Sequence, residues 1–151
     1  MTEVIGIDHI YITASDLQRS ESFYDRVLLE ALGFQKNKFI LGSDPHVQYF
    51  NQHFGYVIRP SHNSNRQDSY APGLHHFCLR VASIADVVAV ANQLRAAGVE
   101  ASEGKLYPEY ARDYWVSIWP YVIDDMFRQP TVTRKPCRKS CESYYHLRAT
   151  E

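Results

Sequence analysis

An internal repeat is the feature of this sequence that most limits the folds it can adopt. Residues 8–17 (DHIYITASDL) align without gaps on residues 75–84 (HHFCLRVASI), so that His9 corresponds to His76. A helical pattern follows each segment and ends in a similar triplet, LGF at 32–34 and AGV at 97–99. A fixed internal period indicates that one supersecondary unit occurs twice.

Both copies of the unit begin with the pattern of a half-buried strand, in which apolar and polar residues alternate. The apolar positions are Ile10 and Ile12 in the first copy and Phe77, Leu79 and Val81 in the second. The residues between them therefore belong to the opposite face of each strand.

Capping residues mark where the two helices begin and end. Ser15 and Ser83 are predicted to cap the helix starts, and Gly33 and Gly98 to end the helices. Further short strands are predicted at 38–41, 46–50 and 56–59, and at 99–101, 114–119 and 126–129. Each half thus has the order β-α-β-β-β, and a polar stretch at 61–72 joins the halves.

Composition excludes several classes of protein. The 151 residues are 45% hydrophobic and 22% charged, which is typical of a globular domain. A net charge of -1 argues against a nucleic-acid binder, and no run approaches the ~20 apolar residues of a membrane span. The N-terminus lacks secretory signal features, and the three cysteines suit a reducing compartment, so we expect a cytoplasmic protein.

The arrangement of short motifs resembles the vicinal-oxygen-chelate superfamily, which includes glyoxalases, extradiol dioxygenases and bleomycin-resistance proteins. The motifs are IDHI at 7–10, FY at 23–24, LGF at 32–34, GLHHF at 73–77 and AAGV at 96–99. The resemblance implies an α+β fold in which two β-α-β-β-β modules form one curved mixed sheet around a cleft, with the helices on the outer face. It also implies a homodimer.

The domain boundaries follow from this assignment. A single domain is expected over residues 1–130, with modules at about 5–60 and 74–130. Residues 131–151 hold five Lys and Arg against two Glu, and we expect them to form a basic C-terminal tail.

The resemblance implies that His9 and His76 are metal ligands, because the family places such histidines on the first and fifth strands. The ion would be divalent Mn, Fe, Ni or Zn. The family's usual final-strand glutamate is absent here, since the alignment places Met126 or Arg128 at its position. A shift of one or two residues would bring Asp125 or Asp124 into this position, and Asp125 is the preferred third ligand.

Candidate substrate-binding residues are the aromatic and cationic side chains expected along the cleft. Aromatic rings supply apolar walls, and a guanidinium group binds carboxylate or phosphate in a bidentate manner. The candidates are Tyr11, Arg80, Trp115 and Arg128.

Two functions remain open from the sequence. The first is a glyoxalase-like metal-dependent enzyme that acts on a small oxygenated substrate, as a lyase, isomerase or dioxygenase. The alternative is a non-catalytic protein of the bleomycin-resistance type that sequesters a small molecule. The paired histidines favour the enzyme, whereas the missing glutamate favours the alternative. In either case the partner is a small molecule, with no nucleic acid and no membrane.

Overall fold

The structure is a computed structural model, and it describes residues 2–63, 72, 74, 76–110, 112, 114–120 and 144–149, with Pro120 and residues 144–149 described by their backbone alone. The chain divides into two compact units. The first module denotes the described residues up to Asn63, and the second module those from Pro72 onward. Each is described by itself.

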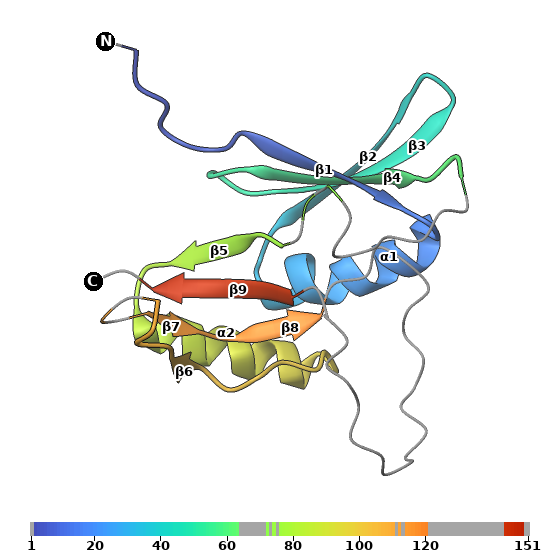
Figure 1. Cartoon of the computed structure of the whole chain (residues 1–151). Helices are drawn as coiled ribbons and strands as arrows, with labels where there is room; N and C mark the ends of the chain where they lie inside the picture. The colour runs from blue at the N-terminus through green and yellow to red at the C-terminus, as the bar shows by residue number, and fades with distance from the viewer. Residues whose placement is uncertain are drawn as a thin grey trace. The chain divides into compact units, whose positions relative to one another are not determined.

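The first module is a four-stranded mixed sheet with a helical segment on one face (Figure 1). Its elements are β1 (His9–Ala14), α1 (Leu17–Tyr24), the π-helix η1 (Asp25–Ala31), β2 (Gln35–Leu41), β3 (Asp44–Phe50) and β4 (Gly55–Pro60). The strand order is β1-β4-β3-β2, with β1 parallel to β4 and the other neighbours antiparallel. This is the β-α-β-β-β order predicted for the first half.

Helix α1 begins one residue later than the predicted cap. Asp16, rather than Ser15, has the extended backbone of a cap, and its Oδ1 accepts a hydrogen bond from the Arg19 amide at 2.9 Å. A carboxylate satisfies the unpaired amides of the first turn and also complements the positive end of the helix dipole, which a hydroxyl does not. At the far end Gly33 adopts the predicted left-handed conformation, with φ of 67°.

Tyrosines form much of the core between α1 and the sheet. Tyr24, Tyr49 and Tyr56 are almost fully buried, and the Tyr56 hydroxyl donates to the Tyr24 hydroxyl at 2.7 Å. The Tyr49 hydroxyl donates to the Asp25 carboxylate at 2.8 Å, and burial together with this carboxylate raises the pKa of Tyr49. Neutral phenols with satisfied hydroxyls can fill a core because they combine apolar area with a bonded polar tip.

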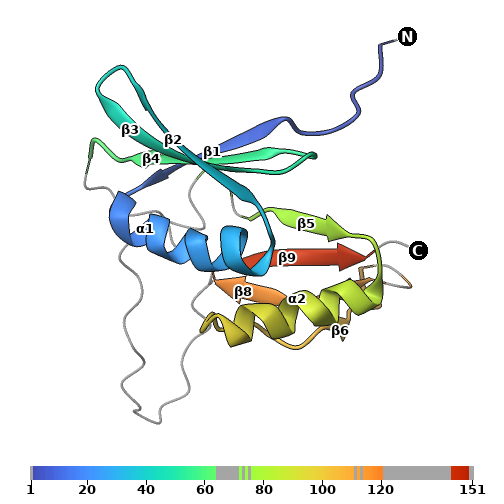
Figure 2. The same ribbon diagram turned by 180° about the vertical axis from the view of Figure 1, so that it is seen from behind.

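The second module also begins with a strand and a helix, but its strands form two smaller sheets (Figures 1 and 2). Its elements are β5 (Cys78–Val81), α2 (Ile84–Ala96), β6 (Lys105–Leu106), β7 (Trp115–Val116), β8 (Ile118–Pro120) and β9 (Tyr144–Ala149). Strands β5, β9 and β8 form one sheet, β6 and β7 form another, and α2 packs against β5, β7 and β9. Ser83 caps α2 as predicted, because its hydroxyl accepts from the Asp86 amide at 3.2 Å. Neither module, where described, holds a helix with the length and apolar character needed to cross a bilayer.

Strand β9 is the main difference from the sequence prediction. Residues 144–149, which were expected in a basic tail, pair in parallel with β5, in the register Cys78 to His146. This pairing repeats the parallel contact of β1 with β4 in the first module. The segment YYHLRA alternates apolar and polar residues, a strand pattern that a charge count over residues 131–151 conceals. The predicted strand at 99–101 is absent, and the one at 126–129 lies outside the described residues.

Candidate functional site on the first module

The first-module sheet has one face covered by α1 and η1, and one that we call the open face. On β1, Ile12 and Ala14 are buried against the helices, whereas His9, Tyr11 and Thr13 are exposed on the open face. The alternation arises because successive side chains of a strand point to opposite faces. The polar residues of β1 therefore lie where the sequence predicted them, away from the helix.

His9 is oriented by the carboxylate that precedes it. Imidazole Nδ1 of His9 lies 2.7 Å from Oδ2 of Asp8, and the His9 side chain is about half exposed, at 53%. A carboxylate at Nδ1 restrains the ring and leaves the other nitrogen, Nε2, to bind a ligand. The same arrangement supports metal-binding histidines in many proteins.

A cavity of about 370 Å³ lies beside His9. It is lined by Asp8, His9, Asn37, Gln48, Phe50, Asn51, Gln52, His53, Phe54 and Gly55. Gly55 pairs with His9 across β1 and β4, and a Cβ added there would lie 3.4 Å from the His9 Cβ. The missing side chain of Gly55 thus helps to keep the space next to the imidazole open.

Aromatic rings continue from His9 across the open face. The ring centroid of Tyr11 lies 5.6 Å from that of His9 and 5.8 Å from that of His46, both in edge-to-face geometry. His46 also stacks on Phe39, at 5.0 Å, and its Nδ1 lies 2.9 Å from the Asp44 carbonyl oxygen. His46 is only 2% exposed, so its contacts indicate a packing role.

Strand β4 supplies no carboxylate to the open face. The residues paired with His9, Tyr11 and Thr13 are Gly55, Val57 and Arg59. Arg59 Nε donates to the Thr13 hydroxyl at 3.2 Å. Within the described residues, no group of three or more His, Cys, Asp or Glu side chains is placed to hold a metal ion. His9 therefore fits a metal-ligand role, but its first-module neighbours do not complete a ligand set.

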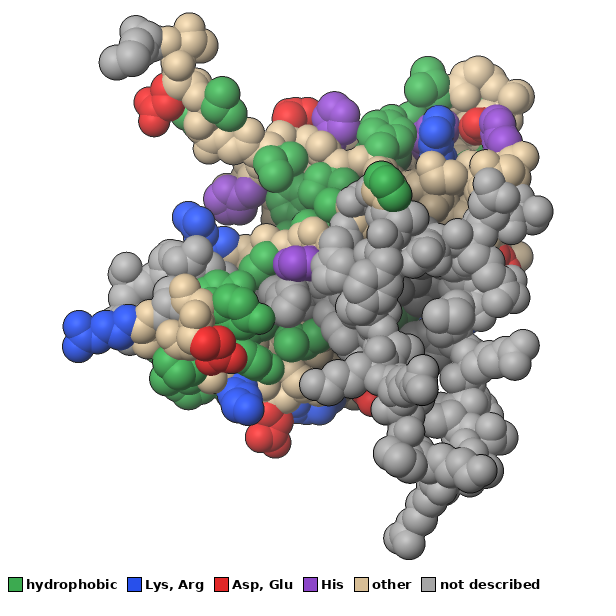
Figure 3. Space-filling model, in the orientation of Figure 1, with side chains coloured by type: hydrophobic (Ala, Val, Ile, Leu, Met, Phe, Trp, Pro, Cys, Tyr) green, Lys and Arg blue, Asp and Glu red, His purple; other side chains and the backbone are tan. Residues whose placement is uncertain are grey.

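The remaining predicted site residues belong to the second module or lie outside the described residues. His76 lies two residues before β5 begins, not on that strand as expected, and it is exposed. Arg80 on β5 is also exposed, and Trp115 on β7 is half-buried. Histidine side chains are visible at the molecular surface in Figure 3. Asp125 and Arg128 lie outside the described residues. The convergence of His9 and His76 stays a prediction.

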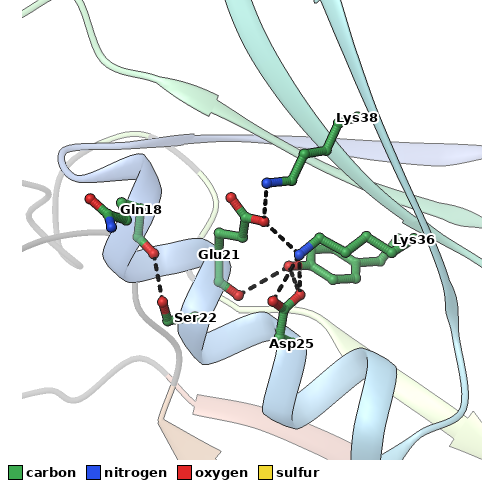
Figure 4. Close-up of polar contacts among 7 residues, drawn as sticks. Gln18, Glu21, Ser22, Asp25, Lys36 and Lys38 are labelled. Carbon is green, nitrogen blue, oxygen red and sulfur yellow. Dashed lines mark hydrogen bonds and ion pairs between the residues drawn. The ribbon is translucent and has the colours of Figure 1, made fainter.

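The cationic side chains of β2 belong to the covered face (Figure 4). Lys36 Nζ lies 2.7 Å from an Asp25 carboxylate oxygen and 2.5 Å from Glu21, which Lys38 also contacts. Burial alone would lower the pKa of Lys36, but its hydrogen bonds to Asp25 and Glu21 outweigh burial and raise it. Burial likewise opposes ionisation of Glu21, but its hydrogen bonds to the two lysines lower its pKa.

Six polar residues at the cavity were not among the predicted site residues: Asp8, Asn37, Gln48, Asn51, Gln52 and His53. Asp8 directly precedes the predicted metal ligand His9, and a carboxylate next to a histidine ligand can be recognised in the sequence. Asn37 and Gln48 lie on the open face by the alternation of β2 and β3. His53 lies in the turn between β3 and β4, where its amide donates to the Asn51 side chain at 2.8 Å, and no residue spacing marks it.

A mixed β-α-β-β-β module with a histidine on the open face of its first strand, followed by a second module that also begins with a strand and a helix, is typical of the vicinal-oxygen-chelate fold. The chain belongs to the Glyoxalase/Bleomycin resistance protein/Dioxygenase superfamily, whose sequence profile matches residues 6–106. No curated protein sequence matches it significantly.

Solved structures show the same fold at low sequence identity. A glyoxylase/bleomycin resistance protein/dioxygenase domain from Frankia sp. EAN1pec is 15% identical, with a TM-score of 0.67 over 99% of this chain and 100% of that one. A glyoxalase family protein from Enterococcus faecalis is 19% identical, with a TM-score of 0.61 over 95% and 97%. A lactoylglutathione lyase from Agrobacterium tumefaciens is 15% identical, with a TM-score of 0.60 over 98% and 96%.

Proposed function

We propose that this protein is a metal-dependent enzyme that binds a small oxygenated substrate beside His9, with His9 and His76 as imidazole ligands of one divalent ion. The observation that supports the proposal is the Asp8–His9 pair at the cavity, in which the carboxylate holds Nδ1 and leaves Nε2 as the nitrogen that can bind a metal ion. Asp125 is the proposed third ligand.

The reactions found in the superfamily define the class of chemistry that we propose for this protein. A divalent ion, when bound, supplies Lewis-acid stabilisation of negative charge on a substrate oxygen. The chain's own residues orient His9 through Asp8 and provide the cavity walls that bind and position the substrate. Tyr11, Arg80, Trp115 and Arg128 are the proposed substrate contacts. The fold shared with a lactoylglutathione lyase is compatible with a lyase reaction, although isomerase and dioxygenase reactions occur on the same scaffold.

A specific observation favours a second function, the binding of a small molecule without catalysis. The open face of β4 offers Gly55, Val57 and Arg59 where a carboxylate ligand would complete a metal site. A binding protein needs the cavity and the aromatic surface but no third ligand.

Calorimetric titration of metal-free protein with Mn²⁺, Ni²⁺ and Zn²⁺ separates the two functions. The metal-dependent enzyme predicts one ion per chain and at least about tenfold weaker binding in His9→Ala. His62→Ala is the matched control, since His62 is an exposed histidine that pairs with Asp44 away from the cavity. Absence of binding to the unmodified protein, or equal affinity in His9→Ala, would overturn the proposal.

A further inference from the structure

We infer that the cavity beside His9 selects an uncharged ligand rich in hydroxyl, carbonyl or carboxamide groups, and that the side-chain amides of Asn37 and Gln48 recognise it. The inference rests on the proposed function insofar as this cavity is the substrate site. It adds a ligand class and two recognition residues to that site.

Of the four side-chain amides that line the cavity, Asn51 and Gln52 already form hydrogen bonds within the turn, which leaves Asn37 and Gln48. They lie directly opposite each other on the antiparallel strands β2 and β3, and both line the cavity. Gln48 Nε2 would lie 3.5 Å from a Cβ at Gly55, so this amide faces the space beside His9. Among the described residues, neither amide forms a side-chain hydrogen bond with another protein group. Each can therefore offer both donors and an acceptor to a ligand.

The described residues that line the cavity include no lysine and no arginine, and their basic groups are the imidazoles of His9 and His53. Lys36 and Lys38 flank Asn37 in the sequence, but the alternation of β2 places them on the covered face, where Glu21 and Asp25 bind them (Figure 4). The acidic group at the cavity is Asp8, which is exposed and contacts His9.

In the metal-free protein, this charge distribution disfavours an anionic ligand at the part of the cavity that the first module lines. A carboxylate or phosphate that enters the cavity loses hydration, and no ammonium or guanidinium group of the lining compensates for that loss. A neutral ligand exchanges water for hydrogen bonds to the two amides, and Phe50 and Phe54 accommodate its carbon skeleton.

Lactamide and lactate provide a matched pair of probes, because they share a skeleton and differ in charge. Their binding to metal-free protein can be followed by NMR, through the side-chain amide resonances of Asn37 and Gln48. We expect lactamide to shift these resonances and to bind at least about fivefold more tightly than lactate, as expected for one hydrogen bond of ordinary strength. Equal or tighter binding of lactate, or shifts at neither amide, would overturn the inference.

Two variants test the role of the amide. Gln48→Leu should weaken lactamide binding at least about fivefold, whereas Gln18→Leu, on helix α1, should leave it unchanged. Backbone amide spectra show whether each variant is folded. A folded Gln48→Leu that binds lactamide as well as the unmodified protein would contradict the assignment.

A parallel metal titration keeps this inference distinct from the proposed function. Lactamide preference without metal binding would support the ligand class and overturn the metal-dependent enzyme. Metal binding, together with tighter binding of lactate than of lactamide to the metal-free protein, would support the metal-dependent enzyme and overturn the ligand class.

Discussion

The imidazole of His9 is held by the carboxylate of Asp8, with 2.7 Å between Nδ1 and Oδ2. Because Asp8 precedes β1 and His9 is its first residue, the pair lies where the strand begins on the open face. The orientation of the proposed metal ligand thus depends on a residue outside the sheet, which makes Asp8 a positioning residue for His9.

Replacing Asp8 by Asn tests this relationship. We expect Asp8→Asn to lower the affinity for a divalent ion about tenfold, because loss of a carboxylate behind a ligating histidine weakens its binding. Calorimetric titration with Zn²⁺ measures the effect. Glu3→Gln, which removes an exposed negative charge from the same N-terminal segment, is the control. An equal loss in both variants would indicate a general charge effect instead.

The cluster of Glu21, Asp25 and Lys36 should stabilise the first module. Lys36→Met leaves two carboxylates without their shared partner, and we expect it to lower the free energy of unfolding by about 2 kcal/mol. Lys38→Met is the matched control, because Lys38 is 62% exposed and should contribute less than about 1 kcal/mol. Urea unfolding measures both, and equal losses would contradict the expected difference.

The same cluster predicts a pH dependence. The lowered pKa of Glu21 means that its contribution is full above its ordinary value of 4.5 and is lost as the pH falls through the lowered pKa. The raised pKa of Lys36 means that its contribution is full below 10.5 and is lost as the pH rises through the raised pKa. The stability difference between the unmodified protein and Lys36→Met should therefore be largest near neutrality. Urea unfolding at acidic, neutral and alkaline pH measures it, and a constant difference would refute the pairing.

Filling the space beside His9 should block the cavity without unfolding the module. A Cβ at Gly55 would lie at ordinary contact distance from His9 and Gln48, so we expect Gly55→Val to change the free energy of unfolding by less than about 1.5 kcal/mol. Its additional methyl groups should weaken lactamide binding at least about fivefold, measured by NMR titration. Gly6→Val is the control, because a Cβ at Gly6 has no neighbour within 4 Å. Unchanged lactamide binding in Gly55→Val would exclude this cavity as the site.

Most of the fold of the first module could be predicted from the sequence. Alternation identified the two faces of β1, and Gly33 ended the helical segment as predicted. The change from α-helix to π-helix at Asp25 was not foreseeable, because residue spacing does not reveal a shift in hydrogen-bond register. Asp16 displaced Ser15 as the cap because both side chains can cap a helix and only the local backbone decides between them.

The candidate site was less accessible to sequence reasoning than the fold. His9 was predicted from a resemblance, but the amides of Asn37 and Gln48 depend on the pairing register of β2 with β3. A one-residue change of register would alter which side chains are opposite each other. Strand β9 was missed for a related reason, since a parallel partner distant in sequence leaves no local turn signal.

We propose that His9 and His76 hold one ion, and spectroscopy of the bound metal tests this proposal most directly. Protein labelled with ¹⁵N-histidine and loaded with Cu²⁺ as a spectroscopic stand-in reports coordinated imidazole nitrogens by pulsed electron paramagnetic resonance. The account predicts two coordinated imidazoles in the unmodified protein and one in either His9→Ala or His76→Ala. A single imidazole in the unmodified protein, or two that persist in His76→Ala, would contradict it.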